Sequence, residues 1–390
     1  MERFDEPTAV LIFHLNKDHS EVGWNIYRKM VDREFPEMFS AVKVPVELAV
    51  QGEDISFLAA ANPVIVEVMR SCPKISVLQG LYTHTLPSFF RGTLKSQLSL
   101  SNNVLKHYLG EKVSWVGSLP ECDVSTPITP FLKEAGWKGV VVLEDLYYTY
   151  EYHKETNALI PLAGETVLRS PEGMPLIVSA GAELRKIYHD FYRGFAKVDD
   201  FFKALEGRAR KSKTNFAVFL TDLEIPQINA IKGKSRTDLW EEFFQAAARS
   251  EIRFCHFEDP EVKRFITDTA KQAQETQINM RSMPKWYHSK PLYRRIAKTF
   301  QENRSADPRD LCRLTISDAF SAIHYRRGCA VLDVKDSDDK VIVKPDLARR
   351  MTAFKYFRMK AEGGMPRLPD EPSLRWYLET LEKAHQEEPP

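Results

Sequence analysis

The sequence predicts an α/β fold, an irregular β/α barrel followed by a mainly helical C-terminal domain. Over roughly residues 1–260, short apolar runs alternate with longer amphipathic stretches. Several of these runs are nearly continuous in β-branched and aromatic residues, as is typical of parallel strands that are buried on both faces. After about residue 260 the strand pattern fades and helical spacing replaces it. We therefore expect a barrel over 1–260 and a helical domain over 261–390.

The expected strands follow the apolar runs along the chain. They cover residues 8–15, 42–50, 75–81, 113–119, 139–144, 174–180 and 215–222, with a weaker run at 252–257. Helical patterns lie between them, at 57–71, 93–109 and 237–250. A doubly wound open sheet is the main alternative to a barrel. Neither GxGxxG nor GxxxxGK[ST] follows any of the runs, so the usual nucleotide-binding signatures are absent.

The C-terminal part has helical patterns at 261–274, 291–303, 308–326, 346–361 and 373–386. Asp307 is a favourable N-cap, and Pro308 suits the first helical position. The segment 331–344 is rich in valine on both sides of a charged stretch, which predicts a small hairpin.

Composition excludes several classes of protein. The 55 basic and 54 acidic residues leave a formal net charge of +1, which argues against a nucleic-acid binder that works through bulk charge. The five cysteines form no CxxC pair, so neither a disulfide framework nor a zinc module is indicated. The N-terminus lacks the apolar stretch of a signal peptide, and no apolar run approaches the ~18 residues needed to span a bilayer. We expect a soluble, cytoplasmic protein without a membrane partner.

Candidate functional residues follow from the barrel. Active groups gather at the carboxyl ends of parallel barrel strands, where this chain places paired acids and two histidines. Singly, each has a structural explanation, because a carboxylate after a strand often caps the next helix. Together they are the set that a glycosidase needs, with one carboxylate as nucleophile or base and the other as acid. The residues are His14, His84, Glu121, Asp123, Glu144, Asp222 and Glu224.

Five short motifs carry a family resemblance. They are His14, Gly80-Leu-Tyr-Thr-His84, Pro120-Glu121, Asp222-Leu-Glu224 and Ser317-Asp318-Ala-Phe320. In this order and spacing they resemble the five conserved regions of glycoside hydrolase family 57. That family contains α-amylases, 4-α-glucanotransferases, amylopullulanases and glucan-branching enzymes. The resemblance runs from residue 14 to residue 320 and implies a distorted (β/α)7 barrel, followed by a helical domain that closes over the active site.

The resemblance also implies roles for individual residues. Glu121 holds the place of the family's nucleophile and Asp222 that of its general acid/base. His14, His84, Glu224 and Asp318 hold places that contact the substrate. Asp318 has support of its own, because it shares a helical stripe with Leu311 and Leu314, where an ionisable group needs a partner or a function. The alternative for Asp318 is a buried salt bridge.

Two aromatic clusters complete the expected site, since sugar rings stack on aromatic faces. Tyr148 lies in a tyrosine-rich loop after run 139–144, and Trp286 lies in a proline-flanked loop between the domains. The alternative is that both clusters pack loops onto the barrel. The expected partner is an α-glucan or oligosaccharide, with no cofactor and no metal.

The expected reaction is a retaining double displacement, with the two catalytic carboxyl groups ~5–5.5 Å apart. Water as the acceptor gives hydrolysis, and a second glucan gives transfer. One alternative is a metal-dependent polysaccharide deacetylase, although His84 has no second histidine four or five residues later. The other is a catalytically weak glucan-binding protein of the same fold.

Overall fold

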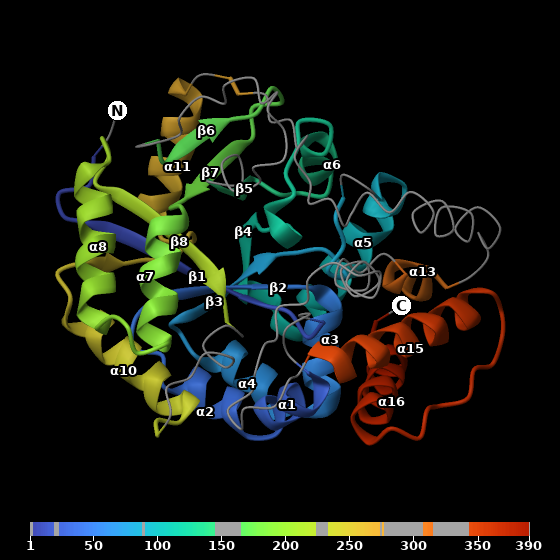
Figure 1. The fold of residues 1–390 in the computed structure, drawn as a ribbon. Helices are drawn as coiled ribbons and strands as arrows, with labels where there is room; N and C mark the ends of the chain where they lie inside the picture. The colour runs from blue at the N-terminus through green and yellow to red at the C-terminus, as the bar shows by residue number, and fades with distance from the viewer. Residues whose placement is uncertain are drawn as a thin grey trace, which may run out of the picture.

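The computed structural model describes residues 3–18, 23–87, 90–144, 165–223, 233–273, 275–276, 307–314 and 343–389 (Figure 1). Most of the predicted hairpin at 331–344, the helix at 291–303 and the end of the helix at 308–326 lie outside the described residues. The last two residues of the hairpin prediction, Val343 and Lys344, were assigned wrongly, because they begin helix α15 (Val343–Ala361).

Seven parallel strands form the barrel. Their order in the sheet is β7-β5-β4-β3-β2-β1-β8. Strands that follow one another along the chain are thus neighbours, and the order never turns back from a central strand as it does in a doubly wound sheet. The strands are β1 (Thr8–Leu15), β2 (Val46–Val50), β3 (Ile75–Gln79), β4 (Val113–Gly117), β5 (Gly139–Leu143), β7 (Pro175–Ser179) and β8 (Phe216–Asp222).

Closure of the barrel between β7 and β8 is irregular. The amide of Ala180, one residue past β7, donates to the carbonyl of Val218 at 2.7 Å. The amide of Leu220 donates to Ser179 Oγ at 2.9 Å, so a side chain replaces a backbone acceptor. Two short strands lie outside the ring: β6 (Val167–Arg169) is antiparallel to β7, and β9 (Arg253–Phe254) pairs with β1. The predicted distorted (β/α)7 barrel is confirmed.

Helices cover the outside of the barrel (Figure 1). The prediction of one helix at 57–71 was wrong, because the chain leaves the helical conformation at Asn62, whose successor Pro63 disfavours it. The helices are α1 (Trp24–Lys29), α2 (Phe35–Ser40), α3 (Gly52–Ala61), α4 (Pro63–Ser71), α5 (Leu94–Leu109), α6 (Thr129–Glu134), α7 (Ala182–Tyr192), α8 (Val198–Lys211), α10 (Arg236–Arg249), α11 (Pro260–Gln272), α13 (Pro308–Arg313), α15 and α16 (Pro372–Glu387).

The side chains of β1 point alternately into an outer and an inner apolar core. On β1, Phe13 points outward and packs against Trp240 and Phe243 of α10, with ring centroids 4.9 and 5.9 Å away. Val10 and Ile12 belong instead to the inner core, which also contains residues of β8 and α11. Because side chains alternate along a strand, His14 lies on the inner face with Val10 and Ile12. The pattern therefore directs this histidine toward the barrel interior.

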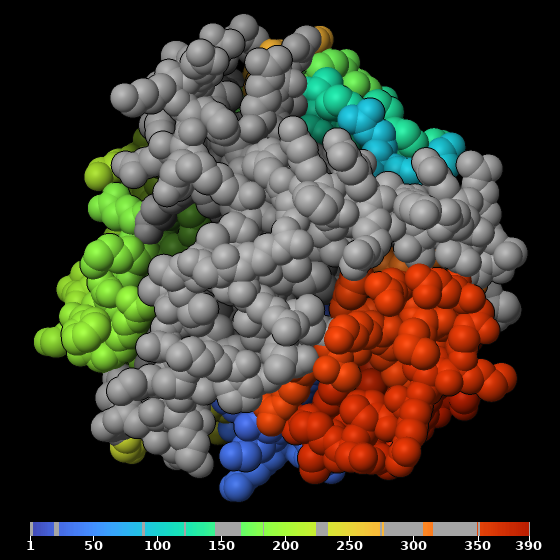
Figure 2. Space-filling view, turned by 45° about the vertical axis from the view of Figure 1, so that its right-hand side comes forward, coloured from blue at the N-terminus to red at the C-terminus, as the bar shows by residue number. Residues whose placement is uncertain are grey.

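The C-terminal helices lie together on one side of the molecule (Figure 2). Tyr377 of α16 stacks on Trp24 of α1, with ring centroids 4.1 Å apart. The predicted cap is confirmed, because Asp307 Oδ1 accepts the amide of Arg309 at 2.8 Å. None of the helices within the described ranges has the length and apolarity required to cross a membrane.

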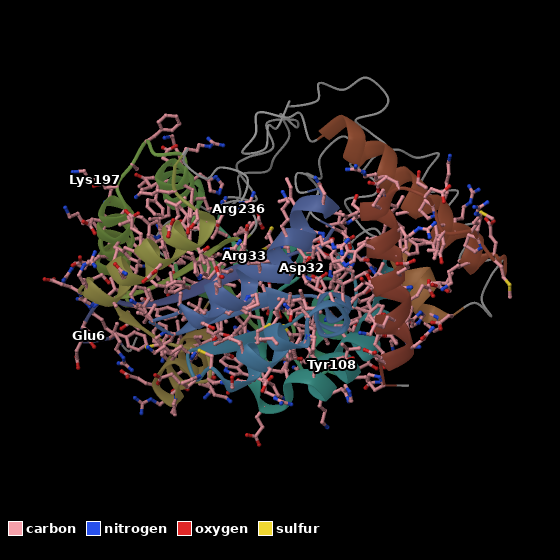
Figure 3. The ribbon with its side chains drawn as sticks, turned by 90° about the horizontal axis from the view of Figure 1, so that it is seen from below. Glu6, Asp32, Arg33, Tyr108, Lys197 and Arg236 are labelled. Atoms are coloured by element: carbon pink, nitrogen blue, oxygen red, sulfur yellow. The ribbon has the colours of Figure 1, made fainter. Side chains whose placement is uncertain are left out.

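The first turn of α10 meets the segment before α2 on another part of the surface. Arg236 and Arg33 lie side by side there (Figure 3). An ion pair of 3.3 Å joins Arg236 to Glu34.

Candidate active site

A histidine and an aspartate meet at the carboxyl end of the barrel. His14 and Asp222 are register partners on the neighbouring strands β1 and β8, so their side chains project to the same side. His14 Nδ1 lies 3.1 Å from Asp222 Oδ1, within hydrogen-bond distance. The side chain of His14 is 12% exposed and that of Asp222 is 35% exposed. Asp222 is thus partly exposed and is held on one side by the mostly buried imidazole of His14.

His84 adds a second imidazole to this pair. Its ring centroid is 5.1 Å from that of His14, and the residue is buried. The segment that carries it is fixed to the start of α3. The amide of Leu81 donates to Gln51 Oε1 at 3.0 Å, and the amide of Gly52 donates to the carbonyl of Leu81 at 2.8 Å. Three of the predicted site residues, His14, His84 and Asp222, are therefore brought together.

Gly80 allows this segment to pass close to β2. A Cβ atom at residue 80 would lie 2.3 Å from the carbonyl oxygen of Val50. We expect Gly80→Ala to displace the segment that carries His84 and to lower the free energy of unfolding by about 1–3 kcal/mol. Urea denaturation measures the change. Gly92→Ala is the matched control, because nothing lies within 4 Å of a Cβ there, and equal stability of the two variants would contradict the expectation.

Glu121 is placed by its backbone alone. It lies in the 3-10 turn Pro120–Cys122 directly after β4, and its side chain is outside the described part of the structure. The next residue, Cys122, has a φ of 48°, in the left-handed region that costs a non-glycine residue ~1–2 kcal/mol. Four further predicted site residues lie outside the described residues: Tyr148, Glu224, Trp286 and Asp318.

A buried cluster of charges lies beside the histidines, and the sequence analysis did not identify it. Lys17, two residues past β1, contacts Asp18, lies 2.7 Å from Glu53 Oε2, and lies 3.8 Å from Asp54 Oδ1. On the far side of Glu53, the guanidinium of Arg313 from α13 forms a second ion pair. All five side chains are almost completely buried. Two cations therefore face three carboxyl groups.

Because acids outnumber cations in this cluster, the neighbouring acids Glu53 and Asp54 have very different pKa values. Burial by itself would raise the pKa of Glu53, but Lys17 and Arg313 lower it to about 2. Burial raises the pKa of Asp54 to about 7, and the carboxyl groups of Asp18 and Glu53 add to that rise while Lys17 opposes it. Asp54 is therefore only partly ionised at neutral pH, which brings the cluster closer to charge balance.

Asp54→Asn tests this protonation state. The folded-state pKa of about 7 exceeds the ordinary value of 3.8, so the stability that Asp54 contributes is complete below pH 3.8 and is lost as pH rises through 7. Asparagine resembles the protonated acid and does not ionise. As pH rises from 5 to 8, we expect the free energy of unfolding of the variant to increase relative to that of the wild type by on the order of 1–3 kcal/mol. Urea denaturation at several pH values measures this, and a parallel pH dependence of both proteins would contradict it.

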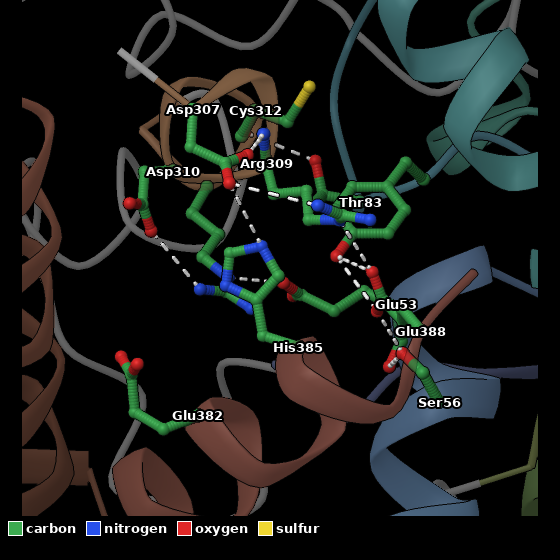
Figure 4. A network of polar contacts seen from close by, with 12 residues as sticks. Glu53, Ser56, Thr83, Asp307, Arg309, Asp310, Cys312, Glu382, His385 and Glu388 are labelled. Carbon is green, nitrogen blue, oxygen red and sulfur yellow. Dashed lines mark hydrogen bonds and ion pairs between the residues drawn. The ribbon is translucent and has the colours of Figure 1, made fainter. Parts of the chain in front are cut away.

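The C-terminal end of α16 joins the same network (Figure 4). The carboxylate of Glu388 accepts hydrogen bonds from Ser56 Oγ at 2.5 Å, from the Tyr82 hydroxyl at 2.9 Å and from Arg309 Nε at 2.9 Å. Ser56 lies in α3, and Tyr82 belongs to the segment that ends in His84. The C-terminal helices are thus bound by polar contacts to the two segments that support the candidate site.

Two other residues refine the site. His189 of α7 is near enough for the charge of Asp222 to act on it: burial lowers the pKa of His189, and Asp222 partly opposes the shift. Glu144 is a structural carboxylate, because it accepts the amide of Gly181 at 3.0 Å and an Arg208 N–H at 2.8 Å. Among the side chains that the structure describes, no group of three His, Cys, Asp or Glu is arranged to hold a metal ion.

Comparison with solved structures identifies the fold. The chain has the fold of glucan-processing barrels. It is similar to the 4-α-glucanotransferase from Thermococcus litoralis, with a TM-score of 0.63 and 14% identity over 94% of this chain and 61% of that one. It is also similar to an α-amylase from Thermotoga maritima, with a TM-score of 0.55 and 11% identity over 97% of both chains. For an exo-type maltose-forming amylase from Pyrococcus sp. ST04 the TM-score is 0.53, with 12% identity over 97% of this chain and 73% of that one.

The sequence matches no protein-family model and no curated protein. The solved structures belong to classes that glycoside hydrolase family 57 contains, so the resemblance is confirmed at the level of the fold. The chain spans less than two thirds of the Thermococcus glucanotransferase.

Proposed function

We propose that this protein hydrolyses or transfers α-glucosidic bonds, with Glu121 as nucleophile and Asp222 as general acid/base. One observation carries the proposal: Asp222 ends a barrel strand and is hydrogen-bonded to His14 of the next strand, whose ring lies beside that of His84. Active sites of β/α barrels occupy this end. The shared fold with enzymes named for α-glucan transfer and hydrolysis supports the choice of substrate.

The proposed reaction has two displacements. Glu121 attacks the anomeric carbon, the glycosidic bond breaks, and Asp222 gives its proton to the departing oxygen. An acceptor hydroxyl then attacks the same carbon, Asp222 takes its proton, and the ester bond to Glu121 breaks. Each displacement inverts the anomeric carbon, so the product retains the original configuration. A carboxyl separation of ~5–5.5 Å is required for this mechanism.

The backbone after β4 supports the assignment of Glu121. Strained residues persist where the surrounding structure enforces them, and they cluster at active sites. Cys122, with its φ of 48°, follows Glu121 directly, and two backbone hydrogen bonds of 2.9 Å hold the turn, from Cys122 to Leu119 and from Asp123 to Pro120. The turn thus holds residue 121 at the carboxyl end of β4.

His14 is a positioning residue in this proposal. Its contact with Asp222 Oδ1 fixes the orientation of the carboxyl group that must meet the glycosidic oxygen. We expect His14→Ala to lower kcat about 10²-fold and to shift the pH profile of kcat, because a misplaced catalytic group costs that order of rate. His14→Gln, which keeps an N–H donor, recovers part of the loss. A rise in KM with kcat and its pH profile unchanged would assign His14 to substrate binding alone.

The helical C-terminal part is proposed to close over the same site. Arg313 of α13 and Glu388 after α16 reach the cluster beside His14 and the segment before His84. These contacts support a role for α13 and the end of α16 in completing the active site.

The decisive test is incubation with maltooligosaccharides and amylose, with products followed for hydrolysis and disproportionation and with Glu121→Ala as control. New sugars that depend on Glu121 support the proposal. Binding of amylose without turnover, unchanged in Glu121→Gln, would instead support a glucan-binding protein. Release of acetate from an acetylated polysaccharide by both the wild type and Glu121→Ala would overturn the proposed chemistry.

A further inference from the structure

A hollow in the surface lies at the opposite end of the barrel from His14 and Asp222. Its volume is about 700 Å³, within the usual range of small-molecule sites. Trp115 of β4 and Lys138, directly before β5, form part of its wall. Arg169 ends β6 opposite Pro175, the first residue of β7. Lys138 and Pro175 lie at the amino ends of β5 and β7, whereas the candidate active site lies at the carboxyl ends of the barrel strands.

The wall of this hollow is basic. Among the lining residues that the structure describes, five are cations and none is a carboxylate; the cations are Lys133, Lys138, Arg169, Lys263 and Lys271. Another hollow lies beside Arg33 and Arg236, and its wall has mixed charge. Its two arginines are accompanied by several carboxylates, Glu34 among them. A concave wall of one charge sign concentrates ligands of the opposite sign.

Not all of the five charges are balanced nearby. Lys263 lies 3.5 Å from Glu258, and Lys271 lies 2.8 Å from Asp268. Lys133 donates to the carbonyl oxygen of Glu172 at 2.7 Å. Lys138 and Arg169 form no side-chain ion pair or hydrogen bond with any residue that the structure describes, so their charges are available to an anion.

Two buried tryptophans, Trp115 and Trp137, form part of the wall next to these cations. Trp115 lies under the ammonium group of Lys263, 5.5 Å from its ring centroid, and its Nε1 donates to the carbonyl of Phe257 at 2.8 Å. Trp137 is packed against Gly117, where a Cβ atom would lie 2.1 Å from the indole. Both rings are therefore held in fixed positions, which makes this side of the hollow rigid before any ligand binds.

We propose that this hollow binds a small organic phosphate, with the phosphate between Lys138 and Arg169 and the ring of the ligand against the apolar part of the wall, which Trp115, Met174 and Pro175 line. A guanidinium presents paired donors that match phosphate oxygens, and an ammonium adds a compact charge. The site is independent of the proposed glucan chemistry, since it shares no residue with the candidate active site. A nucleotide and a sugar phosphate both provide the required chemistry, and the experiment separates them.

The test is calorimetric titration of the full chain with ADP, with glucose 1-phosphate and with inorganic phosphate, each at low and moderate salt. We expect ADP or glucose 1-phosphate to bind at least about 10-fold more tightly than inorganic phosphate and to weaken as salt rises, because the ring contributes contacts and the phosphate contributes charge. The tighter of the two organic probes identifies the source of the phosphate.

Lys138→Ala/Arg169→Ala is the informative variant, and Lys95→Ala is its matched control. Lys95 is an exposed lysine that pairs with Glu134 outside the hollow. The double variant is expected to lose at least about 10-fold in affinity, since two charge-assisted contacts are removed, while the control binds as the wild type does. The proposal is overturned if no organic phosphate binds below about 10 mM, or if the double variant, folded by circular dichroism, keeps wild-type affinity.

Discussion

Glu121→Ala and Asp222→Ala are expected to abolish most turnover of maltooligosaccharides while the protein stays folded. If Glu121 is the nucleophile, as proposed, its loss lowers kcat by on the order of 10³–10⁵-fold, because the covalent route is removed. Loss of Asp222, the proposed general acid/base, lowers kcat by about 10²–10⁴-fold. Initial rates on a defined maltooligosaccharide measure both. The control is Glu144→Gln: Glu144 also follows a barrel strand, but its oxygens bind Gly181 and Arg208, so kcat should change little.

Azide distinguishes the two roles. With α-maltosyl fluoride, the space left in Glu121→Ala admits azide, which attacks the anomeric carbon as fluoride departs and yields the β-glycosyl azide. In Asp222→Ala the fluoride leaves without acid help, Glu121 forms the glycosyl-enzyme, and azide then displaces Glu121 to yield the α-glycosyl azide. NMR of the anomeric proton identifies each product. The opposite pattern would exchange the two roles, and wild-type activity in both variants would remove both residues from the mechanism.

The strands of the barrel could be predicted because each is buried on both faces and leaves a nearly continuous apolar run. β1 and β8 were located almost to the residue. β6 was not predicted, since its three residues are too short to show a pattern. The break between α3 and α4 was missed because apolar residues continue on both sides of Asn62.

The same rule explains which site residues could be found. Looking for polar residues after each strand located His14, His84 and Asp222. Applied to run 42–50 it would also have located Glu53 and Asp54, but acids three residues past a strand look like the favourable first turn of a helix. His189 lies on an amphipathic helix, where no sequence pattern separates it from a solvent-facing residue.

Contacts between the C-terminal helices and the barrel could not be predicted from local sequence patterns. Arg313 pairs with Glu53 across 260 residues of sequence. Glu388 reaches Tyr82 across 306. The local sequence pattern of a helix does not indicate which buried acid its arginine contacts. The contacts between the C-terminal helices and the barrel were therefore found only in the structure.

The Arg313–Glu53 pair predicts the largest change in stability. Arg313→Met is expected to lower the free energy of unfolding by about 3–5 kcal/mol, because removing one member of a buried pair leaves the other charge without compensation. The Arg313 side chain is 0% exposed and also lies 3.2 Å from Asp310 Oδ1, so two buried acids lose a cation. Urea denaturation followed by circular dichroism measures the difference from the wild type.

The pH dependence of the Arg313→Met effect has a definite sign. In the wild type the pKa of Glu53 is about 2, below its ordinary value of 4.5, so its contribution to stability is complete above pH 4.5 and is lost as pH falls toward 2. Without Arg313 the folded-state pKa of Glu53 rises, and this contribution shrinks. The variant should therefore be furthest below the wild type at pH 6–8 and should approach it as pH falls below 4.5.

Two further variants show whether the loss comes from charge. Lys95→Ala removes an exposed cation 3.2 Å from Glu134, and exposed pairs contribute ~0–1 kcal/mol. Glu53→Gln/Arg313→Met removes both charges of the buried pair and should be more stable than Arg313→Met alone, because no carboxylate is then left without its cation. If Arg313→Met is no less stable than Lys95→Ala, the buried pair does not bind the C-terminal helices to the barrel, and the contact from α13 to Glu53 has no energetic role.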